Sequence, residues 1–237
     1  MIEREYTLRY SDLDKNGYVR TSSVMDLMQD MAIYHSAERG YSIDVLKNIH
    51  VAWLLQGWRV EFLGHLCVDK TVLIKTGVMD VVRFSSKRKY EIWQDGKLKI
   101  RATSDWFTVD TQAMRVILVP EQILESFEST LEEDNGFPFV KLRPDRDGVE
   151  EIGATKVEKR DLDTNNHMNN VKSAEVAMEL LPEDFDVGEL QITYRKALLP
   201  DETIKMCRKI REDGVWVELK NAQEETCVLL FAQPMKK

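Results

Sequence analysis

The sequence contains little cysteine and no long apolar run. Its 237 residues include only three cysteines, at 67, 207 and 227, and no CxxC pair. This argues against a disulfide framework and against a structural zinc site. No window approaches 18 consecutive apolar residues, so we expect no membrane-spanning helix. The first residues, MIEREYTLRYSDLDK, resemble neither a signal peptide nor a transit peptide. We therefore expect a cytoplasmic protein.

An excess of basic residues is also missing. Lysine and arginine total 33 against 41 aspartates and glutamates, which gives a formal net charge of −8. A nucleic-acid-binding protein normally carries a basic excess, so this class is disfavoured. The hydrophobic content of 43% and the charged content of 31% are those of an ordinary globular protein. The length fits one large domain or two small ones.

An internal repeat indicates how the chain is organised. Residues 12–19 read DLDKNGYV and residues 161–168 read DLDTNNHM. An offset of 149 aligns two aspartates, a leucine and an asparagine with identical residues, and it aligns Tyr18 with His167. A helical pattern follows each copy. We infer a duplicated module of roughly 110–120 residues, which is near the usual domain size.

Both copies predict a strand, a turn, one helix and then antiparallel strands, which is an α+β pattern. In the first copy the helix spans 23–39, with Ser23 and Asp26 as a capping-box variant. In the second copy the helix spans 170–181. The predicted strands are 3–10, 51–62, 70–79, 83–93, 98–109 and 115–119, then 153–160, 190–197, 203–212, 214–222 and 227–233. We expect domains at 1–127 and 149–237, joined by a linker at 128–148 that contains prolines and glycines.

The densest polar cluster follows the second DLD. If this segment is extended, a spacing of two places Asp163, Asn165 and His167 on one side. An imidazole titrates near neutral pH and can act as a base, while an amide can donate to a carbonyl oxygen. The free N–H groups of the following helix could stabilise an anion. The alternative is that these are ordinary cap and turn residues beside a structural histidine.

The stretch 160–182, RDLDTNNHMNNVKSAEVAMELLP, resembles the D-L-D-x-N-x-H-x-N-N-x-K signature of the acyl-ACP thioesterases of plant plastids and bacteria. The segments 58–62 and 190–196 are similar to that family as well. The resemblance implies a tandem double hotdog, in which each half is a long helix wrapped by an antiparallel sheet. It also implies hydrolysis of fatty acyl thioesters on acyl carrier protein, without a metal or organic cofactor.

The resemblance assigns catalytic roles to Asp163, Asn165 and His167. It implies that His167 directs a water molecule onto the thioester carbon, while Asn165 holds the carbonyl oxygen and Asp163 orients the pair. The family places a glutamate, often followed by cysteine, after the Tyr-Arg-basic strand. Here these two positions are Ala197 and Leu198. This departure excludes a mechanism based on a thiolate, and it removes one carboxylate of the family's site. Asp201 or Glu202 could take the place of that carboxylate.

The expected partner is acyl carrier protein, an acidic protein. Basic runs at 83–89 and 205–211 are its candidate docking sites, although a solvated strand face is an equal alternative. Methionines 25, 28 and 31 are expected in the core rather than in an acyl tunnel. The alternative functions are an acyl-CoA thioesterase, a hydratase and a non-catalytic acyl-binding protein. A homodimer is compatible with the sequence, which leaves the oligomeric state and the preferred acyl chain open.

Overall fold

The computed structural model describes residues 1–68, 70–128, 131–145 and 148–236. The chain divides into two compact units. Unit 1 is Met1–Gln56 with Val60–Phe139, and unit 2 is Gly57–Arg59 with Val140–Lys237. None of the helices among the described residues has both the length and the apolar character needed to cross a membrane. Of the predicted linker, residues 129–130 and 146–147 lie outside the described residues.

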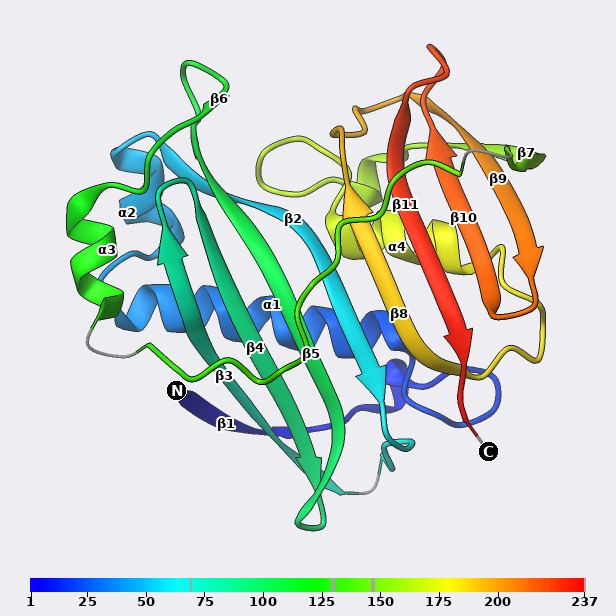
Figure 1. The fold of residues 1–237 in the computed structure, drawn as a ribbon, viewed down its shortest axis with the longest axis horizontal. Helices are drawn as coiled ribbons and strands as arrows, with labels where there is room; N and C mark the ends of the chain where they lie inside the picture. Colours follow the sequence, from blue (N-terminus) through cyan, green and yellow to red (C-terminus); the bar gives the residue numbers. More distant parts are fainter. Residues whose placement is uncertain (69, 129–130, 146–147, 237) are drawn as a thin grey trace. The chain divides into compact units, whose positions relative to one another are not determined.

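Unit 1 is built from one long helix, two shorter helices and an antiparallel sheet (Figure 1). The sheet order is β1-β3-β4-β5-β2, and β6 pairs with β5. The elements are β1 (Ile2–Thr7), α1 (Thr21–Glu38), α2 (Ile43–Asn48), β2 (Val51–Phe62), β3 (Thr71–Val82), β4 (Ser85–Gln94), β5 (Lys97–Asp110), β6 (Arg115–Val116) and α3 (Glu121–Glu128).

Unit 2 repeats this plan with one helix. Its sheet order is β8-β11-β10-β9-β7, which matches unit 1 strand for strand, and its helix likewise follows the first strand. The predicted duplication and the α+β class with antiparallel strands are therefore present in the structure. The elements are β7 (Glu150–Lys156), α4 (Asn170–Met178), β8 (Val187–Tyr194), β9 (Thr203–Arg211), β10 (Gly214–Lys220) and β11 (Thr226–Pro234).

Helix α1 packs one side against the sheet of unit 1 (Figure 1). The three methionines of this helix, at 25, 28 and 31, are completely buried. Their prediction as core residues is confirmed. The predicted capping box at Ser23 is wrong, because the helix begins two residues earlier, at Thr21. The Ser23 hydroxyl donates instead to the backbone oxygen of Asp12, at 3.3 Å, and so ties the helix to the DLD turn. Sequence analysis also missed α2, a six-residue helix capped by Ser42.

Residues 131–139, within the predicted linker, are hydrogen-bonded to the sheet of unit 1. The Glu132 N–H donates to the Val78 oxygen at 2.8 Å, and the Thr103 hydroxyl donates to the Phe137 oxygen at 2.6 Å. Gly77 makes room for this segment, since a Cβ there would lie 2.4 Å from the Cγ of Glu132. Side-chain bulk at position 77 would therefore force the Glu132 side chain to move.

Residues 140–145 are fastened to unit 2 in a similar way. The Leu142 N–H donates to the Thr193 hydroxyl at 3.0 Å, and the Asp145 N–H donates to the Glu218 carboxylate at 2.9 Å. The Asp145 side chain is 2% exposed and forms ion pairs with Lys209 and Arg211. These bonds order the connection against β8, β9 and β10.

Candidate active site

The DLD turn of unit 2 is held by the carboxylate of Asp163. Its Oδ1 accepts the backbone N–H of Asn165 at 2.8 Å and that of His167 at 3.1 Å. The turn closes where the Asp163 N–H donates to the His167 oxygen at 2.7 Å. Asn166 takes a left-handed conformation, with φ of 60°, which asparagine tolerates better than most residues. One carboxylate therefore organises the whole turn.

The DLD turn of unit 1 has the same geometry. The Asp14 Oδ1 accepts the N–H groups of Asn16 and Tyr18 at 2.8 and 3.0 Å, and the Asp14 N–H donates to the Tyr18 oxygen at 2.7 Å. Gly17 takes the left-handed position that Asn166 takes in unit 2. The offset of 149 also relates the first residues of the two helices, Thr21 and Asn170. The shared residues DLDxN thus specify a turn whose geometry does not require a histidine at its end.

The predicted turn is present, so the condition of an extended segment, with the side chains placed on one side by a spacing of two, is not met. Residues 163, 165 and 167 lie in the turn that the Asp163 carboxylate closes. Asn165 is exposed and His167 is half-buried. Within the described part of unit 2, neither side chain has a hydrogen-bond partner. The Asp163 carboxylate, by contrast, is engaged with two backbone amides.

Two contacts from β8 and its following connector support the start of α4. The Tyr194 hydroxyl donates to the Asn170 oxygen at 2.9 Å, and burial raises the pKa of this phenol, which keeps it protonated. The Met168 N–H donates to the Leu198 oxygen at 2.9 Å. The Asn169 side chain caps the helix by accepting the Val171 N–H at 2.7 Å. One of the helix N–H groups expected to serve an anion is therefore already used.

The connector after β8 has a counterpart in unit 1. Residues 63–70 join β2 to β3 and residues 195–202 join β8 to β9, so an offset of 132 aligns them without a gap. The first residue of each connector donates its N–H to a backbone oxygen of the neighbouring strand, β5 or β11, at 2.8 Å. The fourth residue of each is a buried leucine. Over the described residues 63–68 of unit 1, the two connectors therefore correspond.

This equivalence indicates where the side chain of Ala197 lies. Its counterpart in unit 1 is His65, whose ring stacks on Tyr18 with centroids 4.0 Å apart and planes 17° apart. Tyr18 is in turn the counterpart of His167. If the connectors correspond here too, a side chain at position 197 would point toward the residue at 167. Because Ala197 has only a methyl group, the connector brings no carboxylate to this side of the imidazole.

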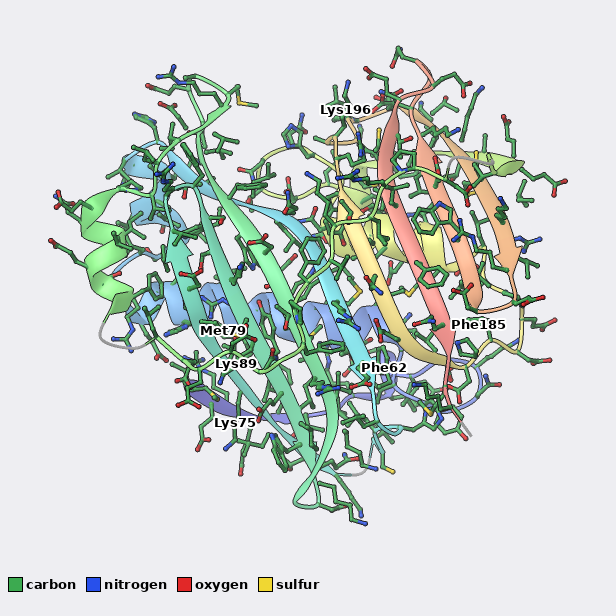
Figure 2. The ribbon with its side chains drawn as sticks, viewed as in Figure 1. Phe62, Lys75, Met79, Lys89, Phe185 and Lys196 are labelled. Carbon is green, nitrogen blue, oxygen red and sulfur yellow. The ribbon has the colours of Figure 1, made fainter. Side chains whose placement is uncertain are left out.

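Both carboxylates considered as substitutes, those of Asp201 and Glu202, have partners. Asp201 forms an ion pair with Lys156 at 2.8 Å, and its carboxylate is largely exposed. Glu202 is half-buried, and its Oε2 accepts the N–H of Leu199 at 2.9 Å. Glu202 therefore acts on the connector rather than directly on the turn. Lys196, just beyond the end of β8 in Figure 2, pairs with Glu225.

The cysteines do not supply a thiolate to this turn. Cys207 and Cys227 are buried in strands, and burial raises the pKa of Cys227 to about 11. A thiol in that environment stays protonated near neutral pH. Among the described residues, no group of three or more histidine, cysteine, aspartate or glutamate side chains is placed to hold a metal ion.

The structure breaks up both basic runs that were candidates for docking an acidic partner. Arg88 is buried and reaches the His35 Nδ1 at 2.8 Å, and Lys89, in the middle of β4, donates to the Glu133 oxygen at 3.1 Å (Figure 2). In the second run, Arg208 donates to the Leu180 oxygen. Its other members pair with acidic side chains: Lys205 with Glu224, and Lys209 and Arg211 with Asp145. Neither run forms a continuous basic surface.

Comparisons with known proteins agree with this architecture. The chain is 21% identical over 223 residues to oleoyl-acyl carrier protein thioesterase 1, chloroplastic, of Arabidopsis thaliana, which covers 85% of this chain and 62% of the relative. It is 19% identical to the corresponding protein of Coriandrum sativum, over 85% of this chain and 60% of that one. The chain thus spans about three fifths of the length of these curated relatives.

Two solved structures share the fold across the chain. An acyl-ACP thioesterase from Bacteroides thetaiotaomicron superposes with a TM-score of 0.83 at 18% identity, over 98% of this chain and 96% of that one. The 12:0-ACP thioesterase from Umbellularia californica gives 0.85 at 14% identity, over 98% and 96%. The family model for the acyl-ACP thioesterase N-terminal domain matches residues 1–127, and the model for the C-terminal domain matches residues 145–231. The chain therefore belongs to the acyl-ACP thioesterase family.

Proposed function

We propose that this protein hydrolyses fatty acyl thioesters of acyl carrier protein, releasing free fatty acid and the carrier thiol and so ending chain elongation. The observation that carries the proposal is the turn at the start of α4. There, Asp163 accepts two backbone N–H groups, while the side chains of Asn165 and His167 have no hydrogen-bond partner within the described part of unit 2. We propose further that each unit is a hotdog module, so that the chain is a tandem double hotdog.

The chemistry assigned to the turn is general-base hydrolysis. The His167 imidazole takes a proton from a water molecule as the water oxygen attacks the thioester carbon. Asn165 and nearby helix N–H groups donate to the carbonyl oxygen as it gains negative charge. The tetrahedral intermediate then collapses and breaks the C–S bond. A thiol of pKa about 8.5 is a good leaving group and needs little acid assistance.

Asp163 contributes by fixing the backbone. Its carboxylate sets the positions of residues 165 and 167 through their amides, so the two reacting side chains leave the turn at defined places. The role expected for Asp163 from sequence, orientation of the Asn/His pair, is retained in the proposal. It is exerted through the backbone and not through a side-chain hydrogen bond.

Hydrolysis assays with His167→Ala test the proposal. We expect wild-type turnover of acyl-ACP, and a loss of roughly 100-fold or more in kcat for the variant, as is usual for a general base. His50→Ala, at an exposed histidine of unit 1, is the matched control. Full turnover by His167→Ala would contradict the assignment.

Assays on the same protein with other substrates separate the alternative functions. The lack of a carboxylate at Ala197 favours one of them, a non-catalytic acyl-binding protein. Binding of acyl-ACP without release of fatty acid would indicate an acyl-binding protein. Preference for acyl-CoA over acyl-ACP would indicate an acyl-CoA thioesterase, and hydration of crotonyl-CoA would indicate a hydratase.

A further inference from the structure

We propose that Glu202 is a positioning residue for the His167 turn, and that it acts as a hydrogen-bond acceptor rather than as a charge. The inference rests on the proposed function, because positioning is meaningful only if His167 is the base. Glu202 does not contact the turn itself. It holds the connector 195–202, which in turn contacts the residue after His167.

Three hydrogen bonds form the path from Glu202 to the turn. The Glu202 Oε2 accepts the Leu199 N–H at 2.9 Å, and the Glu202 N–H donates back to the Leu199 oxygen at 3.2 Å. The first bond holds the N–H of the peptide that joins Leu198 to Leu199, and the second holds the carbonyl group of the next peptide. The Leu198 oxygen belongs to the first of these peptides, and it accepts the Met168 N–H at 2.9 Å. Any rotation of that first peptide moves the acceptor that holds Met168.

The equivalent amide in unit 1 is also fastened by a side chain. Offset 132 pairs Leu199 with Cys67, whose N–H donates to the Gln94 Oε1 at 2.8 Å. The Gln94 amide group donates back to the Cys67 oxygen at 2.8 Å, and Gln94 is 2% exposed. Unit 1 thus uses a neutral carboxamide where unit 2 uses a carboxylate. This position therefore requires an acceptor, and a negative charge is not essential to it.

The two units differ in what the fastened connector then holds. In unit 1 the connector meets the turn through the stacked rings of His65 and Tyr18. Val19 is the counterpart of Met168, and within the described part of unit 1 its N–H has no hydrogen-bond acceptor. In unit 2 the residue at 197 is alanine, so the backbone bond from Met168 to the connector replaces the ring contact. The turn that carries the histidine is the one whose backbone is tied to the connector.

Loss of the acceptor at 202 should therefore displace His167 without unfolding the turn, which the Asp163 carboxylate still closes. Small displacements of a catalytic group can lower the rate by roughly 100-fold. Substrate binding remote from the turn should change little, so the effect should fall on kcat rather than on KM.

The test compares Glu202→Ala and Glu202→Met, which lack the acceptor, with Glu202→Gln, which keeps it. The Met variant retains the aliphatic stem if the Ala variant fails to fold. Glu224→Ala removes an exposed carboxylate of unit 2 that pairs with Lys205, and it is the matched control. The measurements are kcat and KM for acyl-ACP, and hydrogen exchange of the Met168 amide.

We expect the Ala and Met variants to lose roughly 10- to 100-fold in kcat with KM nearly unchanged, and the Met168 amide to exchange at least about tenfold faster. Glu202→Gln should restore both. Wild-type kcat and exchange in the Ala and Met variants would overturn the proposal. So would a Gln variant as slow as Ala with normal Met168 exchange, since Glu202 would then act through its charge. If the wild-type protein does not hydrolyse acyl-ACP, the proposed function fails, and the exchange data alone still decide whether Glu202 holds the turn.

Discussion

The duplicated turn allows the structural and catalytic contributions of one aspartate to be separated. Asp163→Ala and Asp14→Ala remove the same pair of amide-to-carboxylate hydrogen bonds from turns of nearly identical geometry, at 2.8 and 3.1 Å in one and 2.8 and 3.0 Å in the other. Both carboxylates are half-buried. We therefore expect the two substitutions to cost the same stability, but only one of them to cost activity.

The magnitude follows from the bonds that are lost. Replacing a capping aspartate by alanine costs about 0.5–2 kcal/mol, and each turn here loses two acceptor contacts at once. We expect about 1–2 kcal/mol for each variant, with a difference below about 0.5 kcal/mol. For activity, Asp163→Ala should lower kcat by roughly 100-fold, because the backbone at 165 and 167 is released. Asp14→Ala should lower it by less than about threefold.

Chemical denaturation of both variants gives the stability difference, and acyl-ACP hydrolysis by the same preparations gives kcat. Two results would refute the reasoning. If Asp163→Ala is far less stable than Asp14→Ala, the turns are not energetically equivalent and the loss of activity cannot be separated from folding. If both variants lose activity equally, the two turns act together and the assignment of catalysis to the second one is wrong.

Two further predictions concern pH. Burial and the neighbouring Arg88 lower the pKa of His35 to about 3, so the folded state resists protonation while the unfolded chain, near 6.5, does not. The free energy of unfolding should therefore fall as pH drops below 6.5, by roughly 2 kcal/mol at pH 4 once solvent screening is allowed for. Denaturation curves at several pH values should show a weaker pH dependence for His35→Gln, but not for His50→Gln at an exposed position. Ala197→Glu would place a carboxylate beside His167 and favour the imidazolium, so the acid limb of the kcat/KM profile should move to higher pH by roughly one unit. Ala222→Glu, in an exposed turn of unit 2, should leave the profile unchanged, and an unshifted profile in Ala197→Glu would show that position 197 does not face the imidazole.

Much of the architecture could be predicted from local patterns. The repeat at offset 149, the apolar spacing of α1 and the alternation of the strands are all written in short windows of sequence. Helix α2 was missed because six residues give too little periodicity to detect. The helix start at Thr21 was misplaced because its N-cap residue, Arg20, provides no capping side chain, and the Ser23 hydroxyl is used by the turn instead.

The site could be predicted only in part, because its members are recognisable while their contacts are not. The DLDTNNH segment predicted a turn and identified Asp163, Asn165 and His167 as candidates, but not the hydrogen bonds by which the aspartate closes that turn. Glu202 gave no comparable signal. Its role depends on a hydrogen bond to Leu199 and on the contact of that connector with Met168, 34 residues before Glu202 in the chain.

The sequence by itself determined the duplicated plan and the candidate residues at the start of α4, because both depend on residues close together in the chain. Only the tertiary structure decided which distant residues contact those candidates and which charged side chains remain on the surface. The sequence predicted Arg88 and Lys89 as part of a docking surface. In the structure both are buried, and Lys89 donates to the Glu133 oxygen in the segment 131–139. The equivalence of position 197 to His65, whose ring stacks on the other turn, likewise becomes apparent only after the strands assemble, since hydrogen bonds and ring contacts between distant segments leave no periodic pattern along the chain.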